Sequence, residues 1–161
     1  MKIKALVMDI DGTLTDGRIY IGPTGESMKA FNVKDGYGIA HILPKHKIMP
    51  IIITGRKSVI TEKRAEELNI HCLYQNVSNK VSILKKIMDE NKLVSDAVAY
   101  IGDDLNDLSA MKMCGFVGCP NDSVKEVLEY ADYVCTKNGG AGAVREFIDY
   151  IVKKYEHEIR K

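Results

Sequence analysis

Apolar and polar residues follow two alternating patterns along the chain. Short, nearly continuous apolar runs predict buried strands of a parallel sheet at residues 3–8, 49–53, 71–74, 97–101, 116–119 and 133–135. Between and after these runs, apolar residues recur every three to four positions, which predicts helices at about residues 39–45, 57–69, 80–91, 105–113, 124–130 and 144–155. Strands that alternate with helices, without a repeat or a linker, predict an α/β fold, a three-layer sandwich around a mainly parallel, Rossmann-like sheet.

Two segments depart from this alternation. Turn residues at 22–25 separate two short β-prone stretches, which predicts a β-hairpin over about residues 17–33, beside the carboxyl end of the first strand. Near the other end of the chain, the glycine-rich residues 138–142 predict a flexible turn before the last helix. We therefore expect one domain over residues 1–161, with the hairpin as a flap and about residues 138–161 as a C-terminal tail.

Local signals add detail to the predicted helices. The glycine-rich residues 35–38 predict a loop before the helix at 39–45. Pro44 is expected to bend or end that helix. Asn79 and Ser123 are expected to cap the helices that come after them. In the amphipathic helix at 57–69, the residues expected to face inward are Val59, Ile60, Ala65 and Leu68.

The composition is that of an ordinary globular protein and changes this picture little. The chain has 161 residues, of which 45% are apolar and 28% are charged, enough for one full hydrophobic core. Its formal net charge of +1 argues against a nucleic-acid scaffold, and its apolar runs are too short to span a membrane. The four cysteines lack CxxC spacing and no signal-peptide pattern precedes the first strand, so we expect a cytoplasmic protein with reduced thiols.

Polar residues of the types that bind metals and phosphate follow three of the predicted strands. Asp9-Ile10-Asp11-Gly12-Thr13 follows the first strand, Thr54-Gly55-Arg56 the second, and Gly102-Asp103-Asp104 the strand at 97–101. Lys80 begins a helix on the same side, and the carboxyl ends of parallel strands converge on one crevice. Carboxylate oxygens suit Mg²⁺, while an ammonium, a hydroxyl and free backbone N–H groups suit a phosphoryl group.

Each of these residues also has a purely structural explanation when it is taken alone. The acids at 9–11 also fit a solvated turn, Thr54 also fits the simple end of a strand, and Lys80 also fits an exposed helix start. Asp103 and Asp104 also fit a helix N-cap, since acids are favourable at that terminus. Their joint occurrence in this order, at strand ends, is what favours a functional site.

The same motifs resemble those of a known superfamily. Residues 9–13, 54–56, Lys80 and 102–107 resemble the four motifs of the haloacid dehalogenase (HAD) superfamily phosphatases. The resemblance implies that Asp9 is a nucleophile that forms an aspartyl-phosphate and that Asp11 is the general acid–base. The other implied roles are phosphate binding by Thr54, Gly55 and Lys80, Mg²⁺ coordination by Asp9, Asp103 and the backbone carbonyl of Asp11, and support from Asp104 and Asp107.

The segments between these motifs are too short for an inserted cap domain. The segment between Asp11 and Thr54 has room for a hairpin and one helix, and the segment between Lys80 and Asp103 has room for a single helix. This capless pattern, with residues 31–39 and 139–146, resembles phosphatases of 3-deoxy-D-manno-octulosonate 8-phosphate (KDO 8-phosphate). The resemblance implies a small sugar phosphate as substrate, no nucleic-acid or membrane partner, and a homotetramer in which neighbours close each site. The substrate-binding residues that it implies are Arg56, Asn106 and Arg145.

Other functions remain open at this point. Phosphatases of nine-carbon ulosonate 9-phosphates share most of these motifs, but tend to carry an acid where this chain has Arg56. Another small phosphomonoester would require the same chemistry. A signalling receiver domain would place its phosphoacceptor aspartate where Thr54 stands, and a catalytically inactive partner would not need every chemical residue.

Overall fold

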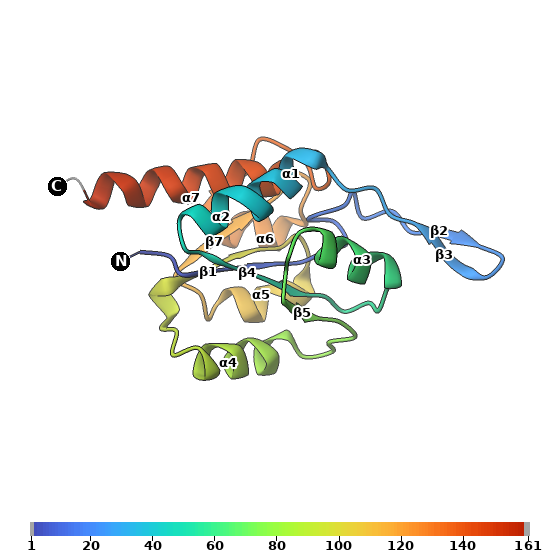
Figure 1. Ribbon diagram of the computed structural model, residues 1–161, viewed down its shortest axis with the longest axis horizontal. Helices are drawn as coiled ribbons and strands as arrows, with labels where there is room; N and C mark the ends of the chain where they lie inside the picture. Colours follow the sequence, from blue (N-terminus) through green and yellow to red (C-terminus); the bar gives the residue numbers. More distant parts are fainter. Residues whose placement is uncertain (1, 160–161) are drawn as a thin grey trace.

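A six-stranded sheet runs through the computed structural model, which describes residues 2–159 and their side chains up to residue 154. Its strands lie in the order β5-β4-β1-β6-β7-β8, and every neighbouring pair is parallel. The strands are β1 (Ala5–Met8), β4 (Met49–Ile53), β5 (Cys72–Tyr74), β6 (Val98–Ile101), β7 (Phe116–Cys119) and β8 (Tyr133–Val134). A separate antiparallel pair, β2 (Tyr20–Gly22) and β3 (Gly25–Met28), projects from the body as a hairpin (Figure 1).

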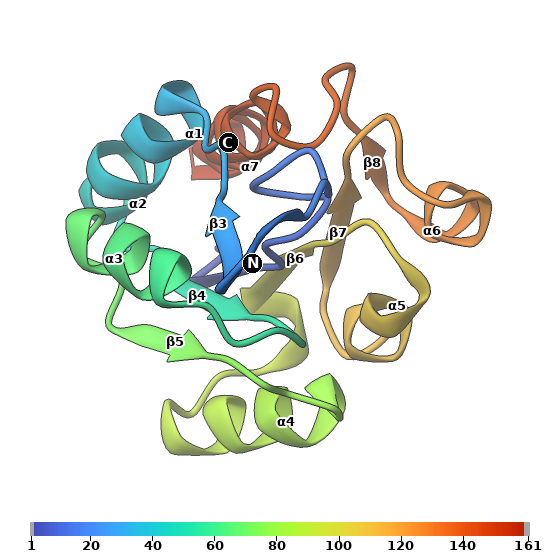
Figure 2. The ribbon, with the colours of Figure 1, turned by 90° about the vertical axis from the view of Figure 1, so that its right-hand side faces the viewer.

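Helices cover both faces of the sheet, which gives the predicted three layers (Figure 2). One face is covered by α1 (Val33–Tyr37), the π-helical turn η1 (Gly38–Ile42), α2 (Leu43–Lys45), α3 (Val59–Glu67) and α7 (Ala143–Ile159). The other face is covered by α4 (Lys80–Glu90), α5 (Leu105–Met111) and α6 (Lys125–Tyr130), and a short 3-10 turn, η2 (Ser95–Ala97), precedes β6. Along β1, Leu6 and Met8 pack into the first layer and Ala5 and Val7 into the second. This two-sided burial explains the continuous apolar runs, and the predicted fold class is confirmed.

Helical structure begins at Val33, ahead of the predicted start at residue 39, so the loop predicted at 35–38 is wrong. Asn32 caps this segment, because its side chain accepts a hydrogen bond from Lys34 N at 2.8 Å. Gly38 allows a close approach, because a Cβ there would lie 3.0 Å from Ile148 Cδ1 of α7. The glycines that predicted a loop therefore serve helix packing.

Two further details of the helices were predicted wrongly and one was predicted correctly. Val59 is 61% exposed at the first position of α3, and Thr61 is buried instead. The Ser123 hydroxyl donates to Pro120 O at 2.7 Å, so it does not cap α6. Asn79 does cap α4, because its side chain accepts from Ser82 N at 3.1 Å.

The turn predicted to be flexible at 138–142 is instead packed against the loop that follows β1. A Cβ on Gly139 would collide with the backbone carbonyls of Gly12 and Thr15. Gly140 has a φ of +69°, and its N–H donates to Thr13 O at 3.1 Å. The turn therefore supports the strand end that carries the first acidic motif, and α7 then continues into the core.

The remaining sequence expectations concern the thiols and membranes. All four cysteines are free. Over residues 2–159, no helix is long and apolar enough to cross a membrane.

Candidate active site

The acidic motifs meet because of the register of the three central strands. Met8 at the end of β1 pairs with Ile52 of β4 on one side and with Ile101 of β6 on the other. The N–H of Asp9, which follows β1, donates to Ile101 O at 3.1 Å. The chain reverses its direction of strand addition around β1, and such switch points are where ligands of open α/β sheets bind.

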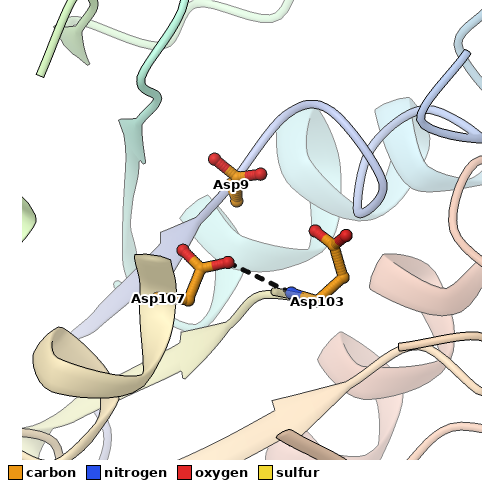
Figure 3. Close-up of side chains that lie close together, drawn as sticks. All are labelled: Asp9, Asp103 and Asp107. Carbon is orange, nitrogen blue, oxygen red and sulfur yellow. Dashed lines mark hydrogen bonds between the residues drawn. The ribbon is translucent and has the colours of Figure 1, made fainter. Parts of the chain in front are cut away.

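Three carboxylates gather at this point (Figure 3). Asp9, Asp103 and Asp107 each present an oxygen, and these oxygens all lie within 4.8 Å of one another. Asp9 is 5% exposed and Asp107 is fully buried, while Asp103 is half-buried. Carboxylates at this spacing repel one another, so the cluster needs positive charge close by.

Lys80 supplies part of that charge. Its Nζ donates to Asp9 Oδ1 at 2.6 Å and to Asp107 Oδ1 at 2.7 Å, and its side chain is 3% exposed. Tyr100, from β6, also donates to Asp107 Oδ1, at 2.8 Å. The N–H of Asp103 donates to Asp107 Oδ2 at 3.2 Å. Both oxygens of Asp107 are thus engaged by the chain itself, and Asp107 acts as a fixed counterion that holds Lys80.

Burial and mutual repulsion shift the pKa values of the carboxyl groups in this cluster. Burial, together with repulsion from Asp107, raises the pKa of Asp9 to about 7, although Lys80 opposes this rise. Burial and the charge of Asp9 raise the pKa of Asp103 to about 7, although the Thr13 hydroxyl donates to Asp103 Oδ1 at 2.9 Å. Burial would lower the pKa of Lys80, but Asp9 and Asp107 raise it above its usual value. A hard divalent cation beside Asp9 and Asp103 would balance these charges.

Glycine allows the two acidic loops to approach so closely. Gly12 has a φ of +99°, and a Cβ there would overlap the Asp103 carboxylate. A Cβ on Gly102 would lie 2.5 Å from Asp107 Cγ. The Gly12 that follows Asp11 in the first motif is therefore required by the packing of the loop after β1 on the loop after β6.

The structure brings Thr54 to the same edge of the sheet. Thr54 is buried at the end of β4, where its N–H donates to Tyr74 O at 2.9 Å and its carbonyl accepts from Val77 N at 3.1 Å. Gly55 and Arg56 follow it and are exposed. Hydrogen bonds to Tyr74 of β5 and to Val77 thus hold Thr54 in place. Arg56 lies beside the hairpin, with its Nη2 3.9 Å from Glu26 Oε1.

The other predicted residues lie in different surroundings. Asp104 is the exposed N-cap of α5, and its side chain accepts a hydrogen bond from Leu105 N at 2.7 Å. The acid of this motif that pairs with Lys80 is Asp107. Asn106 is exposed in the first turn of the same helix.

Arg145 on α7 is engaged away from the carboxylate cluster. Its Nε donates to both oxygens of Asp149 at 3.0 Å, and its Cζ lies 5.4 Å from the centre of the Tyr37 ring. The structure thus brings Asp9, Asp103 and Lys80 into one cluster and places Thr54 at the same edge of the sheet. It does not bring Arg145 to them within one chain.

Sequence reasoning missed two residues that contact this site. Tyr100 was taken only as part of a buried strand, because its hydroxyl partner lies in a helix that follows. Lys29 donates to Asp11 Oδ1 from the end of the hairpin. No spacing signal marks either residue, since each contact depends on how two elements pack.

Comparisons with known proteins agree with this geometry. A family model described as haloacid dehalogenase-like hydrolase matches residues 57–148. A relative from Escherichia coli strain K12, named 3-deoxy-D-manno-octulosonate 8-phosphate phosphatase KdsC, is 43% identical over 150 residues, which cover 93% of this chain and 79% of the relative.

Two solved structures are similar to this chain over most of its length. A phosphatase of the same name from Yersinia pestis has a TM-score of 0.90 and 42% identity, covering 94% of this chain and 81% of its own. The one from Moraxella catarrhalis, solved with magnesium ion, phosphate ion and KDO, has a TM-score of 0.89 and 39% identity, covering 94% and 86%.

Proposed function

The chain belongs to the haloacid dehalogenase-like hydrolases, and from that membership we propose that it hydrolyses KDO 8-phosphate to the free sugar acid and phosphate. It is a phosphoric monoester hydrolase. The observation that carries the substrate is the 43% identity, over 93% of this chain, with a relative named for that reaction. The Asp9–Lys80–Asp107 cluster beside Asp103 supports the same chemistry, because it joins a buried carboxylate nucleophile to a fixed cation.

Mg²⁺ fits the donors that this cluster offers. Asp9 and Asp103 present hard oxygens, and burial, together with repulsion from the neighbouring carboxylates, raises the pKa of each carboxyl to about 7. We propose that these two carboxylates and the backbone carbonyl of Asp11 hold the ion. When bound, Mg²⁺ supplies positive charge against the oxygens of the transferring phosphoryl group.

In the first step we assign the bond-making to Asp9 and the proton transfer to Asp11. A carboxylate oxygen of Asp9 attacks phosphorus, the bond from phosphorus to the sugar oxygen breaks, and Asp11 gives its proton to that leaving oxygen. Lys80 holds Asp9 Oδ1 at 2.6 Å and so limits the side chain to one orientation. Lys80, the Thr54 hydroxyl and the Gly55 N–H are proposed to bind the phosphoryl oxygens, and Asp104 and Asp107 to support the site.

In the second step the same residues act in reverse. Asp11, now ionised, takes a proton from a water molecule, and the water oxygen attacks phosphorus of the aspartyl-phosphate. The bond between phosphorus and Asp9 breaks, which releases phosphate and restores both carboxyl groups to their starting states. The chemistry at phosphorus requires no residue outside one chain.

Recognition of the sugar is proposed to need a neighbouring subunit. Residues 2–159 include no inserted cap over the site, and the hairpin exposes Ile21 by 76% and Met28 by 55%, apolar surface that a neighbour would bury. We therefore propose a cytoplasmic homotetramer, in which residues 1–161 form one domain and the hairpin is its flap. Arg56 and Asn106 would contact the sugar acid within the chain, and Arg145 would do so from α7 of a neighbour.

A phosphate-release assay over a panel of substrates tests the proposal. KDO 8-phosphate, a nine-carbon ulosonate 9-phosphate and p-nitrophenyl phosphate are compared at equal concentrations with Mg²⁺. The proposal predicts the highest kcat/KM for KDO 8-phosphate, by about tenfold or more. A higher kcat/KM for the nine-carbon ester would assign the alternative substrate, and no phosphate release from any ester would refute the phosphatase assignment.

A further inference from the structure

Lys29 is a buried lysine on an otherwise exposed hairpin. It directly follows β3, where Ser27 and Met28 are exposed, yet its own side chain is only 1% exposed. Burying an ammonium is unfavourable unless it is paired and hydrogen-bonded. Lys29 meets this requirement with two carboxylates: its Nζ donates to Asp11 Oδ1 and forms an ion pair with Glu26 Oε1 at 2.9 Å.

Glu26 anchors Lys29 to the body of the protein. The Ser58 hydroxyl, at the N-cap of α3, donates to Glu26 Oε2. Burial would raise the pKa of Glu26, but the hydrogen bonds from Ser58 and Lys29 and the charges of Lys29 and Arg56 lower it below its usual value. Glu26 therefore stays ionised at neutral pH, and the chain of contacts from Ser58 through Glu26 to Lys29 ends on Asp11.

The second cation near Asp11 is held much less firmly. Arg56 Nε lies 3.8 Å from Asp11 Oδ2, beyond hydrogen-bond distance, and its side chain is 50% exposed. Arg56 Nη2 lies 3.9 Å from Glu26 Oε1. Arg56 is thus free to turn toward a ligand, whereas Lys29 is enclosed and its hydrogen bond to Asp11 fixes one carboxylate oxygen.

We propose that Lys29 is a positioning residue for the acid–base step, which it serves by holding the Asp11 carboxyl group through Oδ1. This inference rests on the proposed function. With Oδ1 held, Oδ2 is the atom that carries the proton to the leaving sugar oxygen and later takes a proton from water, while Lys29 keeps its own protons throughout. The hairpin then does more than offer surface to a neighbour, because its last residues orient the general acid of the same chain.

Leaving-group dependence separates positioning from a loss of structure. A sugar alkoxide is a poor leaving group and needs the proton of Asp11, whereas p-nitrophenolate departs readily without it. The ratio kcat/KM reports the steps up to formation of the aspartyl-phosphate, where this difference acts. We expect Lys29→Met to lower kcat/KM for the sugar phosphate by about 10- to 100-fold and for p-nitrophenyl phosphate by about threefold or less.

Three reference variants are measured in the same assay. Asp11→Asn sets the loss that follows from removing the acid entirely, and it should show the same substrate pattern with a larger amplitude. Lys29→Arg keeps a cationic donor and should recover part of the lost activity on the sugar phosphate. Lys86→Met is the matched control, because Lys86 is 63% exposed on α4 and pairs only loosely with Glu90, at 3.8 Å; it should equal the parent chain.

A crystal structure of the variant tests the inference without relying on turnover. In Lys29→Met, or in Glu26→Gln/Lys29→Gln if the single variant does not fold, the Asp11 side chain should occupy more than one rotamer while Asp9 and Lys80 stay in place. An equal fall in kcat/KM for both substrates, no fall for either, or an unchanged single Asp11 rotamer would overturn the inference. If the parent chain releases no phosphate from any ester, the proposed function fails by itself, and the Asp11 rotamer still decides whether Lys29 positions it.

Discussion

The carboxylate cluster is built from mostly buried residues that follow the central strands or begin the helices beside them, whereas the hairpin is mostly exposed. Asp9, Lys80 and Asp107 are each at most 5% exposed, and they are held by β1, α4 and α5. On the hairpin, Ile21 is 76% exposed, and its two short strands pair only with each other. Two regions that meet at Asp11 thus differ in burial, in support and in the number of elements that hold them.

This difference separates two tasks. Bond-making at phosphorus requires charges that are already in place, and a buried cluster held between strand ends and helix starts provides them without rearrangement. An isolated two-stranded hairpin is marginally stable in water, so its position depends on what it contacts. Here Lys29 contacts Asp11 and Glu26 contacts Ser58, which attaches the hairpin to the body of the protein. We propose that a neighbouring subunit provides further contacts. The hairpin is therefore suited to control access and proton transfer.

Removing the nucleophile from the buried cluster should abolish nearly all turnover. We expect Asp9→Asn to lower turnover by about 10³-fold or more while the protein stays folded, because no other carboxylate can take the place of Asp9. Phosphate release from KDO 8-phosphate measures the effect. Asp89→Asn, on the exposed side of α4, is the control and should be fully active. Residual activity above a few per cent in the purified Asp9→Asn variant would reject the role of Asp9.

Chelation should silence the same cluster without any mutation. EDTA should lower activity by about 10²-fold or more, and added Mg²⁺ should restore it, because Asp9 and Asp103 otherwise repel each other and the incoming phosphate. Metal content measured by elemental analysis on the same samples serves as the control. Full activity in metal-free protein would contradict the metal assignment.

A substitution on the hairpin should have a smaller and more selective effect. Ile21→Ser removes an apolar side chain that we expect to be buried between subunits, worth about 1.5–3 kcal/mol per copy. Sedimentation at micromolar concentration should show smaller assemblies, and kcat/KM should fall for the sugar phosphate more than for p-nitrophenyl phosphate. Val94→Ser, at an exposed apolar residue that precedes η2, is the matched control. A parent chain that is monomeric and fully active would disprove the subunit proposal and leave the aspartyl-phosphate chemistry intact.

The smallest effect concerns the pH dependence of stability in the metal-free protein. The pKa of Asp103 is raised from 3.8 to about 7, so the folded state favours its protonated form. The stability that this carboxyl contributes is fully present below about pH 3.8 and is lost as the pH rises through about 7. Asp103→Asn stays neutral, so in EDTA its melting temperature should exceed that of the parent by a margin that grows from pH 5 to pH 8, to several degrees.

Saturating Mg²⁺ provides the control for that measurement. The ion binds only the ionised cluster, so it should stabilise the parent more than Asp103→Asn and reverse the order at pH 8. A difference between the two proteins that does not change with pH would mean that Asp103 titrates normally in the folded chain.

The sequence by itself determined the layers of the fold and the residues at the strand ends. Each buried strand is a local apolar run, such as Met49–Ile53, whose predicted and observed bounds coincide. Parallel strands order their carboxyl ends at one edge, so Asp9, Thr54 and Asp103 were predicted to meet from their positions along the chain alone. The capping of α4 by Asn79 was also predictable, because a cap and its partner lie within one turn.

Only the tertiary structure decided which side chains support these residues. Gly38 suggested a loop, yet a glycine is needed there because Ile148, far along the chain, packs closely against it. Likewise, Lys29 reaches Asp11 and Tyr100 reaches Asp107 because of the paths of the hairpin and α5. Periodicity and strand ends are local properties that a few neighbouring residues encode. A side-chain contact between two elements depends on how those elements pack, and no spacing in the sequence records it.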